Sequence, residues 1–538
     1  MGIPSYFSHI VKEHRDIIKE LDPNIIFDNL YLDSNGIIYE CANNSHNEWL
    51  DSKGNKKKYE KKLIKMVLLK IKEYIDVINP QKEILIAFDG VAPVAKLNQQ
   101  RERRYKSWIQ NEILCKSNST CSSDIASTWD TCSITPGTEF MSLLSKEIRK
   151  HFSNNKSIRV SPPDEPGEGE HKIYSLIRDN PKYHKESRTA IYGLDADLIM
   201  LTLNHLDIAP SLYLYRETPH FIKSIDSTLE PCSSYVIDIP KFARYFKGSL
   251  DKLSSVSRDI VKDYVFMCFL LGNDFLPHFP SLNIRTGGID KLLTIYSECI
   301  KNKKKFGLVK NNCIQWRYLR ELIIKLAETE YDSILEEHET REKRSKMNYR
   351  YCVGGDQREN IHEFQLTNIP IKERTLENFI NPEEEGWEWR YYKSLFDIDI
   401  DEERCKEICI NYLEGLEWVL AYYTTGCKSW TWSYKYKYPP LFNDLVKFVP
   451  YFDTIFIEED TSGPVTPLTQ LSYVLPREKL NLLPAKLLKR LLKEYPNWYE
   501  MNVDIIWAYC RYFWESHPIL PEIKIDKLSE LVNSCCKE

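Results

Sequence analysis

The sequence SPPDEPGEGEHKIYSLIRDNPKYHKESRTAIYGLDADLIML, residues 161–201, is the stretch that decides the fold. It contains two acidic pairs, Glu168 with Glu170 and Asp195 with Asp197, and one residue separates the members of each pair. The first pair follows a Pro-Gly turn and opens an amphipathic helical pattern. The second pair directly follows the apolar run TAIYGL, which is typical of a buried strand. The stretch therefore predicts regular elements with carboxylates at their ends.

Four carboxylates that meet at such ends repel one another unless a cation lies between them. A divalent metal ion is the simplest such cation, and hard oxygen ligands suit Mg²⁺ or Mn²⁺. The alternative for either pair alone is structural, because acidic residues at a helix N-terminus complement the helix dipole and cap free N–H groups. Further acids elsewhere in the chain must decide between the two interpretations.

Two more apolar runs lead to an aspartate. The strand pattern that begins at residue 29 reaches Asp33, and the pattern over residues 84–88 is followed by Asp89. With Asp195 they form a strand–helix–strand series, which predicts an α/β fold with a doubly wound, mainly parallel sheet flanked by helices. Ligands bind beyond the carboxyl ends of the strands in such a sheet. We therefore expect these three aspartates to meet at one edge.

Asp274 follows an apolar helical pattern over residues 261–271. The helix dipole disfavours an anion at the C-terminal end of a helix, so a charge there indicates a ligand. The number of such acids now favours a metal site over helix capping. The predicted ligands are Asp33, Asp89, Glu168, Glu170, Asp195, Asp197 and Asp274.

A basic helical face follows Asp89. Lys96, Gln100, Arg103 and Arg104 have the spacing i, i+4, i+7 and i+8, which places them on one side of a helix. Ammonium and guanidinium donors beside a metal site predict a phosphate pocket. The alternative is a solvated charged helix surface, the usual outcome for such runs.

Aromatic residues alternate with small or charged residues in SWTWSYKYKY, residues 429–438. On a strand, this alternation places all five rings on one face. We expect most of them to pack on the core, while one or two could stack on the bases of single-stranded nucleic acid.

The composition bounds the class of protein. The 538 residues are enough for two or three domains. The formal net charge of −5 argues only weakly against a nucleic-acid binder, because basic patches act locally. The 15 cysteines lack zinc-site spacing, which favours reduced thiols. No apolar run is long enough to span a bilayer, so we expect no membrane contact.

Three regions are expected along the chain. Residues 1–330 form the catalytic domain. Residues 331–385 have mixed charges and few apolar anchors, which predicts an inserted or linking segment of little order. Residues 386–538 form a largely helical region that packs on the catalytic domain.

Taken together, these motifs resemble the Xrn family of eukaryotic 5′→3′ exoribonucleases. The resemblance covers most of the chain and rests on MGIPSYF, DNLYLDSNGII, FDGVAPVAKLNQQRERR, ITPGTEFM, PGEGEHKI, YGLDADLI, LLGNDFLPH, EGLEWVLAYY and GCKSWTWSY, in the order of the family. It implies a 5′-nuclease (PIN-like) core that hydrolyses single-stranded RNA with a 5′-monophosphate processively to nucleoside monophosphates, in RNA turnover such as mRNA decay. It also implies that the seven acids bind two Mg²⁺ ions, with Mn²⁺ as a substitute. Lys96, Gln100, Arg103 and Arg104 would bind the 5′-monophosphate.

In this family, a histidine and a tryptophan sandwich the first base. Tyr39 stands at the histidine position, and a tyrosine can stack but cannot take on positive charge near neutral pH. The tryptophan lies in the SWTW segment, where either Trp430 or Trp432 fits. The resemblance also implies a short form, without the long C-terminal extension of the larger cytoplasmic members.

Two alternative functions share part of this pattern. One is a structure-specific DNA nuclease similar to flap endonucleases, which share the acidic cluster. Those enzymes resemble one another in a Gly-rich hairpin after their last metal-site acid, and the residues after Asp274 lack such a hairpin. The other is an inactive RNA-binding scaffold, which need not keep all seven acids.

We expect a cytoplasmic monomer, with nuclear import through the lysines of residues 56–62 or 303–305 as the alternative. The sequence does not identify protein partners.

Overall fold

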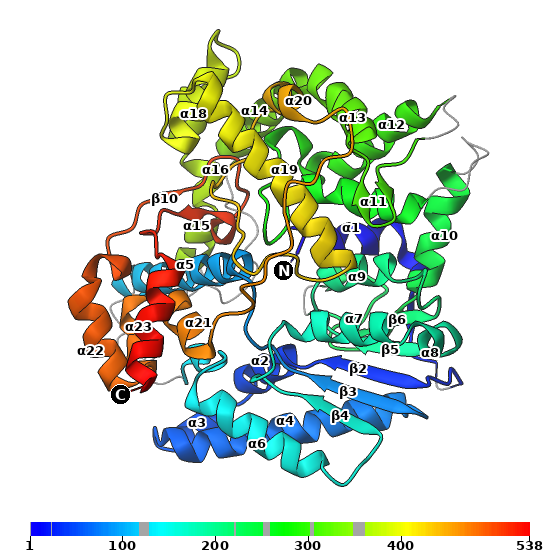
Figure 1. Cartoon of the computed structure of the whole chain (residues 1–538), viewed down its shortest axis with the longest axis vertical. Coiled ribbons are helices and arrows are strands. Elements are labelled where there is room, and N and C mark those ends of the chain that lie inside the picture. The colour runs from blue at the N-terminus through cyan, green and yellow to red at the C-terminus, as the bar shows by residue number, and fades with distance from the viewer. Residues whose placement is uncertain are drawn as a thin grey trace.

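The N-terminal part of the chain is built on a seven-stranded sheet with the strand order β1-β7-β6-β5-β2-β3-β4, of which β2, β3 and β4 are seen in the lower part of Figure 1. The computed structural model describes residues 2–22, 24–117, 129–219, 222–250, 259–301, 306–347 and 361–537. Five neighbouring strands run parallel: β2 (Asn29–Asp33), β3 (Glu83–Ala87), β4 (Ile158–Ser161), β5 (Thr189–Tyr192) and β6 (Leu212–Glu217). Two more, β7 (Ser234–Ile237) and β1 (Ile18–Glu20), pair antiparallel at one edge. The predicted mainly parallel sheet is confirmed.

Helices cover both faces of this sheet. On one face, α2 (Asn35–Asn43), α4 (Lys56–Ile78) and α6 (Glu139–Phe152) share a core with Leu30 and Ile84. On the other face, α7 (Gly169–Asp179) and α9 (Asp197–Asn204) share a core with the residues that directly follow Leu30 and Ile84 on the same two strands. Successive side chains of a strand point to opposite faces. Strands that are buried on both sides therefore have continuous apolar sequences.

The core behind α7 and α9 continues into the helical part of the chain. It includes apolar residues of α11 (Ile260–Cys268), α12 (Gly288–Ile300), α13 (Trp316–Glu328) and α19 (Glu402–Thr424). Trp418 of α19 is fully buried in this core. The helical region thus packs directly on the sheet domain, and the two share one apolar interior.

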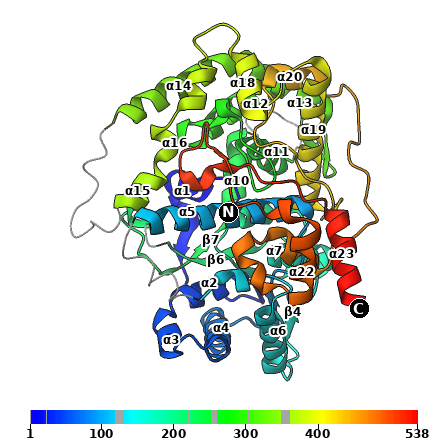
Figure 2. The same cartoon turned by 90° about the vertical axis from the view of Figure 1, so that its left-hand side faces the viewer.

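The long helix α5 (Val94–Ser117) crosses the middle of the molecule (Figure 2). Leu97 near its start lies in a separate core with α21 (Pro467–Val474), α22 (Ala485–Glu494) and α23 (Ile525–Lys537). Arg101 donates to the carbonyl oxygens of Pro521 and Trp498 at 2.7 and 3.0 Å. These contacts anchor the helix that carries the predicted phosphate-binding residues.

The prediction of a poorly ordered segment over residues 331–385 is wrong for its described parts. They contain α14 (Glu330–Lys346), α15 (Ile361–Thr367), α16 (Ile369–Lys372) and α17 (Thr375–Ile380). Arg341 and Arg374 both donate to the buried carboxylate of Glu377. The mixed charges predicted an inserted or linking segment, whereas several of them neutralise one another inside the protein.

The prediction of a strand over residues 429–438 is also wrong, because this segment is irregular. Its rings do not share one face but meet different partners. Trp432 stacks on Trp418, Tyr434 meets Tyr412 edge-on, and Tyr438 meets His517 edge-on. Within the described ranges, no strand pairs with this segment, so nothing enforces a two-residue repeat.

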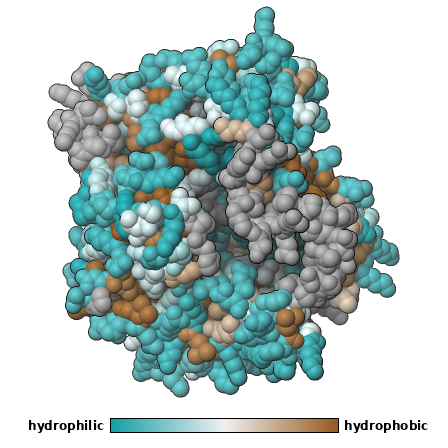
Figure 3. All heavy atoms as spheres, turned by 180° about the vertical axis from the view of Figure 1, so that it is seen from behind, coloured by the Kyte–Doolittle hydropathy of each residue, from teal (hydrophilic) through white to brown (hydrophobic). Residues whose placement is uncertain are grey.

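The described surface is mainly hydrophilic when seen from behind, with small separate hydrophobic areas (Figure 3). None of the helices in the described ranges combines the length and the apolar character that a bilayer crossing requires. Lys56, Lys57 and Lys58 are exposed at the start of α4. The lysines of residues 303–305 lie outside the described residues, as do residues 118–128.

Candidate active site

Three of the predicted aspartates follow neighbouring parallel strands. β5, β2 and β3 lie side by side in the sheet. Asp33 is the last residue of β2, while Asp89 and Asp195 lie just beyond β3 and β5. Because parallel strands end at the same edge, these side chains are brought together there.

The other acids come from helices that begin or end at the same edge. Glu168 is the N-cap residue of α7, Glu170 lies in its first turn, and Asp197 is the first residue of α9. A Cβ atom on Gly169 would lie 2.6 Å from Oδ1 of Asp33. The glycine therefore allows α7 to approach β2 closely enough for its acids to join the cluster.

Lys96 of α5 ties two of these acids together. Its Nζ lies 2.8 Å from Oε1 of Glu168 and 2.8 Å from Oδ2 of Asp274. The backbone N–H of Gly2 donates to the other oxygen of Asp274 at 3.2 Å. Asp89 accepts from the backbone N–H of Gly169 at 2.7 Å and from Nδ2 of Asn35 at 2.6 Å.

Burial and mutual repulsion raise the pKa of most acids in the cluster. Burial and then the charges of Asp89, Asp195 and Glu168 raise the pKa of Asp33 well above its ordinary value. Burial and Glu168 raise the pKa of Asp89 to about 6. Burial and Asp274 raise the pKa of Asp197 to about 7. These shifts also show that the carboxylates lie within electrostatic reach of one another.

Glu170 and Asp274 differ in their relation to Lys96. Burial raises the pKa of Glu170 even though the Lys96 ammonium opposes it. Burial would also raise the pKa of Asp274, but the direct contact with Lys96 lowers it below its ordinary value. One ammonium group therefore compensates only part of the negative charge in the cluster.

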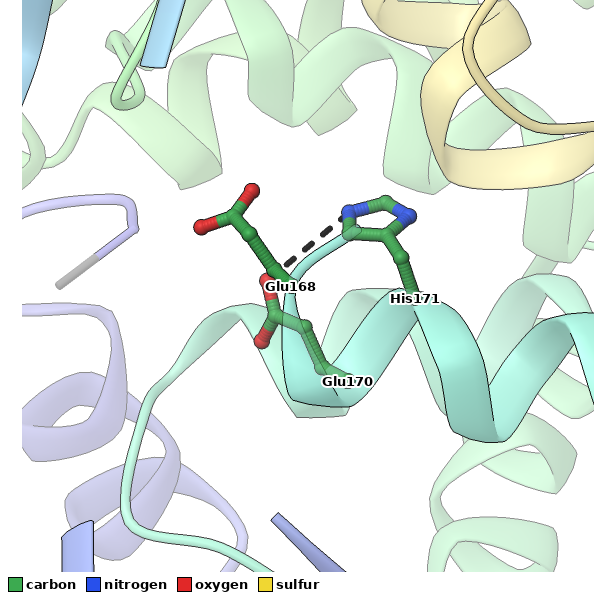
Figure 4. Close-up of side chains that lie close together, drawn as sticks. All are labelled: Glu168, Glu170 and His171. Carbon is green, nitrogen blue, oxygen red and sulfur yellow. Dashed lines mark ion pairs between the residues drawn. The ribbon is translucent and has the colours of Figure 1, made fainter. Parts of the chain in front are cut away.

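The donor set fits a divalent metal ion. Oδ1 of Asp33 and Oδ1 of Asp197 are buried and have no hydrogen-bond partner among the described residues. Buried polar atoms are normally paired, so these oxygens are available to a ligand. Ligand atoms of Glu168, Glu170 and His171 lie within 4.8 Å of one another and face the same space (Figure 4). Carboxylate oxygens are the ligands that Mg²⁺ and Mn²⁺ prefer.

The structure thus gathers all seven predicted acids, and it adds residues that the sequence analysis did not single out. Asn35 orients Asp89, His171 lies 3.8 Å from Glu170, and the hydroxyl of Tyr422 donates to Oε2 of Glu168 at 2.6 Å. His171 stands within the PGEGEHKI motif, and Tyr422 within EGLEWVLAYY. Both motifs were recognised, but no periodic pattern points to these side chains.

The four predicted phosphate-binding residues do not all lie in one place. Lys96 is engaged with the acids, whereas Arg104 lies farther along α5 and donates to Oγ1 of Thr135 at 2.6 Å. Nη1 of Arg104 is buried without a hydrogen-bond partner among the described residues. Gln100 is half-buried between them and Arg103 is exposed. Burial lowers the pKa of Arg104, and Tyr39 is among the groups that act on it electrostatically.

The SWTW segment lies against the start of α5, because the carbonyl oxygen of Trp430 accepts from the backbone N–H of Val94 at 2.9 Å. Trp430 is half-buried. Trp432 is also half-buried, and its Nε1 donates to Glu414 at 3.2 Å. Both rings therefore remain candidates for base stacking near the helix that carries the predicted phosphate-binding residues.

Comparison with known proteins agrees with this geometry. Residues 1–218 match the family of the XRN 5′-3′ exonuclease N-terminus, and residues 256–377 and 371–535 match the Xrn1 helical domain. The chain is 29% identical to 5′-3′ exoribonuclease 2 of Gallus gallus, over 97% of this chain and 68% of the relative. It is 28% identical to 5′-3′ exoribonuclease 1 of Saccharomyces cerevisiae, over 90% of this chain and 40% of the relative.

Human 5′-3′ exoribonuclease 1 is 27% identical over 99% of this chain but only 34% of its own length. The chain therefore spans about two thirds of the chicken relative and far less of the yeast and human ones. The two family matches together cover both the sheet domain with its acidic cluster and the helical region that packs on it. This chain belongs to the XRN family of 5′-3′ exonucleases.

Proposed function

We propose that this chain is a 5′-3′ exoribonuclease that degrades single-stranded RNA with a 5′-monophosphate to nucleoside monophosphates. The observation that carries the proposal is the cluster of seven carboxylates at the sheet edge, with an α5 arginine nearby that has no carboxylate partner among the described residues. The family match and the names of the relatives support the direction of hydrolysis and the RNA substrate.

The seven acids would hold two divalent cations, Mg²⁺ with Mn²⁺ as a substitute. When bound, such ions supply an activated water and neutralise charge on the phosphate and on the leaving 3′-oxygen. The protein fixes the ligands in place through Lys96 on Glu168 and Asp274, and through Asn35 and Gly169 on Asp89. A preorganised, largely buried site lowers the barrier because its charges need no rearrangement during the reaction.

Arg104, with Gln100 and Arg103, would bind the 5′-monophosphate. The unpaired Nη1 of Arg104 supports this role, because a buried guanidinium donor without an acceptor is available to an oxyanion. Lys96 would contribute its charge from within the acidic cluster, between the phosphate group and the reacting bond. A pocket of this kind accepts one phosphate and excludes a cap or a triphosphate by size.

Tyr39 would stack on the first base, opposite a tryptophan of the SWTW segment. The electrostatic proximity of Tyr39 to Arg104 supports its place beside the phosphate pocket. Replacing Trp430 and Trp432 singly with alanine distinguishes the two, because loss of a stacked base costs about 1–3 kcal/mol of RNA binding. The tryptophan whose loss weakens binding of a short 5′-phosphorylated RNA is the stacking partner.

The direct test is incubation with end-labelled single-stranded RNAs that carry a 5′-monophosphate, a 5′-triphosphate or a 5′-hydroxyl. We expect stepwise release of mononucleotides from the first substrate with Mg²⁺ or Mn²⁺, and none with EDTA. A flapped duplex DNA in the same assay tests the endonuclease alternative. Preferential cleavage of the flap, or no metal-dependent release from any RNA, would contradict the proposal.

A further inference from the structure

Four aromatic rings form a continuous stack that begins beside the acidic cluster. The ring of His171 lies 3.7 Å from that of Tyr422, centroid to centroid, with 35° between the planes. Tyr422 stacks on Trp418 at 4.7 Å and 19°, and Trp418 stacks on Trp432 at 5.3 Å and 26°. The stack therefore runs from the start of α7, through α19, to the SWTW segment.

The hydroxyl of Tyr422 also reaches the acidic cluster. It donates to Oε2 of Glu168 at 2.6 Å, while Nζ of Lys96 lies 2.8 Å from Oε1 of the same carboxylate. Both oxygens of Glu168 therefore have a partner in the protein.

Tyr422 itself has little freedom to move. Its side chain is 3% exposed, one face of its ring lies against His171, and the ring also stacks on the fully buried Trp418. Nε1 of Trp418 donates to the carbonyl oxygen of Ser429 at 2.8 Å, which fixes the Trp418 ring in the stack. Glu168 and Tyr422 are 254 residues apart in the sequence, so the contact joins the sheet domain to the helical region.

We propose that Tyr422 is a positioning residue for the metal-binding acids: its hydroxyl holds Glu168 in the orientation in which it binds a divalent cation, and the ring stack through Trp418 to Trp432 holds Tyr422. The inference rests on the proposed function. It assigns to α19 a part in metal binding, although that helix contributes none of the seven acids. It also links the metal site mechanically to the segment proposed to contact the first base.

The test is the affinity of the full chain for Mn²⁺ without RNA, measured by the electron paramagnetic resonance signal of free Mn²⁺. Tyr422→Phe keeps the ring and removes only the donor to Glu168. We expect it to weaken Mn²⁺ binding about tenfold, because loss of a group that orients a metal ligand typically costs 10–100-fold in affinity. In turnover, kcat should fall with Mn²⁺ below saturation, while KM for 5′-phosphorylated RNA stays within about twofold.

Tyr499→Phe is the matched control. Tyr499 is fully buried and its hydroxyl donates to the carbonyl oxygen of Ser472 at 2.8 Å, in the separate core around α21. We expect this variant to bind Mn²⁺ like the wild type. Circular dichroism and the melting temperature of both variants verify that they are folded.

A second variant tests the stack from its other end. Trp432→Leu removes the last ring and its hydrogen bond to Glu414 but touches none of the seven acids, and we expect a smaller loss of Mn²⁺ affinity, about threefold. Combined with Tyr422→Phe, the losses should be less than additive, because both changes release the same carboxylate. Wild-type Mn²⁺ affinity in both variants would overturn the inference. Failure of the wild type itself to bind Mn²⁺ or to degrade RNA would overturn the proposed function instead.

Discussion

Two regions of the molecule contain buried carboxylates, but the neighbouring charges are positive in one region and mainly negative in the other. In the helical region, Glu377 is 1% exposed, and it accepts from Arg341 at 2.6 and 2.9 Å and from Arg374 at 2.6 Å. Burial alone would raise the pKa of Glu377, but the two arginines lower it below its ordinary value. At the sheet edge, burial and neighbouring acids instead raise the pKa of Asp33 and Asp197, and each keeps one buried oxygen without a partner among the described residues.

This difference indicates that a structural cluster of charges is distinguished from a functional one by whether its carboxylates have partners of opposite charge, and not by how deeply they are buried. A buried carboxylate that its own protein satisfies helps to hold the fold together. A cluster that the protein leaves partly unsatisfied costs stability in the absence of a ligand and is explained by the ligand it binds. The arginines follow the same rule, because Arg341 has a carboxylate partner and Arg104 has none among the described residues.

The largest expected effect is on catalysis. Replacing Asp195 and Asp197 together with alanine should abolish release of nucleoside monophosphates, a loss of at least about 1,000-fold, because two of the proposed metal ligands disappear. Binding of RNA should survive, which a filter-binding assay with 5′-phosphorylated RNA checks. Alanine at the exposed Asp76 of α4 is the control. A double variant with wild-type turnover would show that the acids at the sheet edge do not bind the catalytic metal.

The next largest effect is on stability in the helical region. Glu377→Gln leaves the guanidinium groups of Arg341 and Arg374 without their negative partner. Removing one member of a buried ion pair costs roughly 3–5 kcal/mol, so the melting temperature should fall clearly. Glu385→Gln, at an exposed position, should leave it unchanged. If Glu377→Gln melted at the same temperature as the wild type, the claim that the buried ion pairs of Glu377 stabilise the fold would be wrong.

Arg104→Ala should reduce the preference for 5′-monophosphate ends. A hydrogen bond to a charged group contributes about 1.5–3 kcal/mol, which corresponds to a tenfold to hundredfold loss in preference. The measurement is the ratio of kcat/KM for RNA with a 5′-monophosphate to that for RNA with a 5′-hydroxyl. Lys57→Ala on α4 serves as a charge-matched control on the surface. An unchanged ratio for Arg104→Ala would place the phosphate pocket elsewhere.

The smallest effect is the pH dependence of stability without metal. The pKa of Asp197 is about 7 in the folded chain against an ordinary value of 3.8, so the folded state holds this proton over a pH range in which the unfolded state has lost it. Stability in EDTA should therefore rise as the pH falls from 8 to 6, by about 1.4 kcal/mol for one such group.

The control for this pH dependence is Asp197→Asn, which removes the titrating group and keeps its shape. The variant should show a weaker dependence in EDTA, and saturating Mg²⁺ should remove the dependence in the wild type, because the metal replaces the proton. Thermal melting at pH 8 and pH 6 measures both. A wild type that becomes less stable in EDTA as the pH falls would reverse the predicted sign.

The sheet and the acidic cluster could be predicted because both follow from local patterns. The apolar runs before Asp33, Asp89 and Asp195 identify strands, and the geometry of a parallel sheet brings their ends together. Glu168 and Glu170 could be added because a Pro-Gly turn marks the start of their helix. Each step depends on a few neighbouring residues.

The remaining features depend on contacts between distant parts of the chain. Lys96 shares a helix face with Arg104 in the sequence pattern, yet it turns to Glu168 and Asp274 because two carboxylates attract it more strongly than solvent does. The sequence of the helix Glu330–Lys346 is mainly polar, and only the structure shows that Arg341 is buried in an ion pair with Glu377. Likewise, nothing near Glu168 in the sequence indicates that Tyr422 will donate to it.

The most direct test of the central claim is anomalous X-ray diffraction from crystals of this chain soaked in MnCl₂ at pH 7.5. We expect two Mn²⁺ peaks at the sheet edge, with carboxylate oxygens from the cluster as ligands and with Asp33 and Asp197 among the residues that supply them. Crystals of the Asp195→Ala, Asp197→Ala variant should lose at least one peak. Wild-type crystals without any Mn²⁺ among these seven carboxylates would contradict the account.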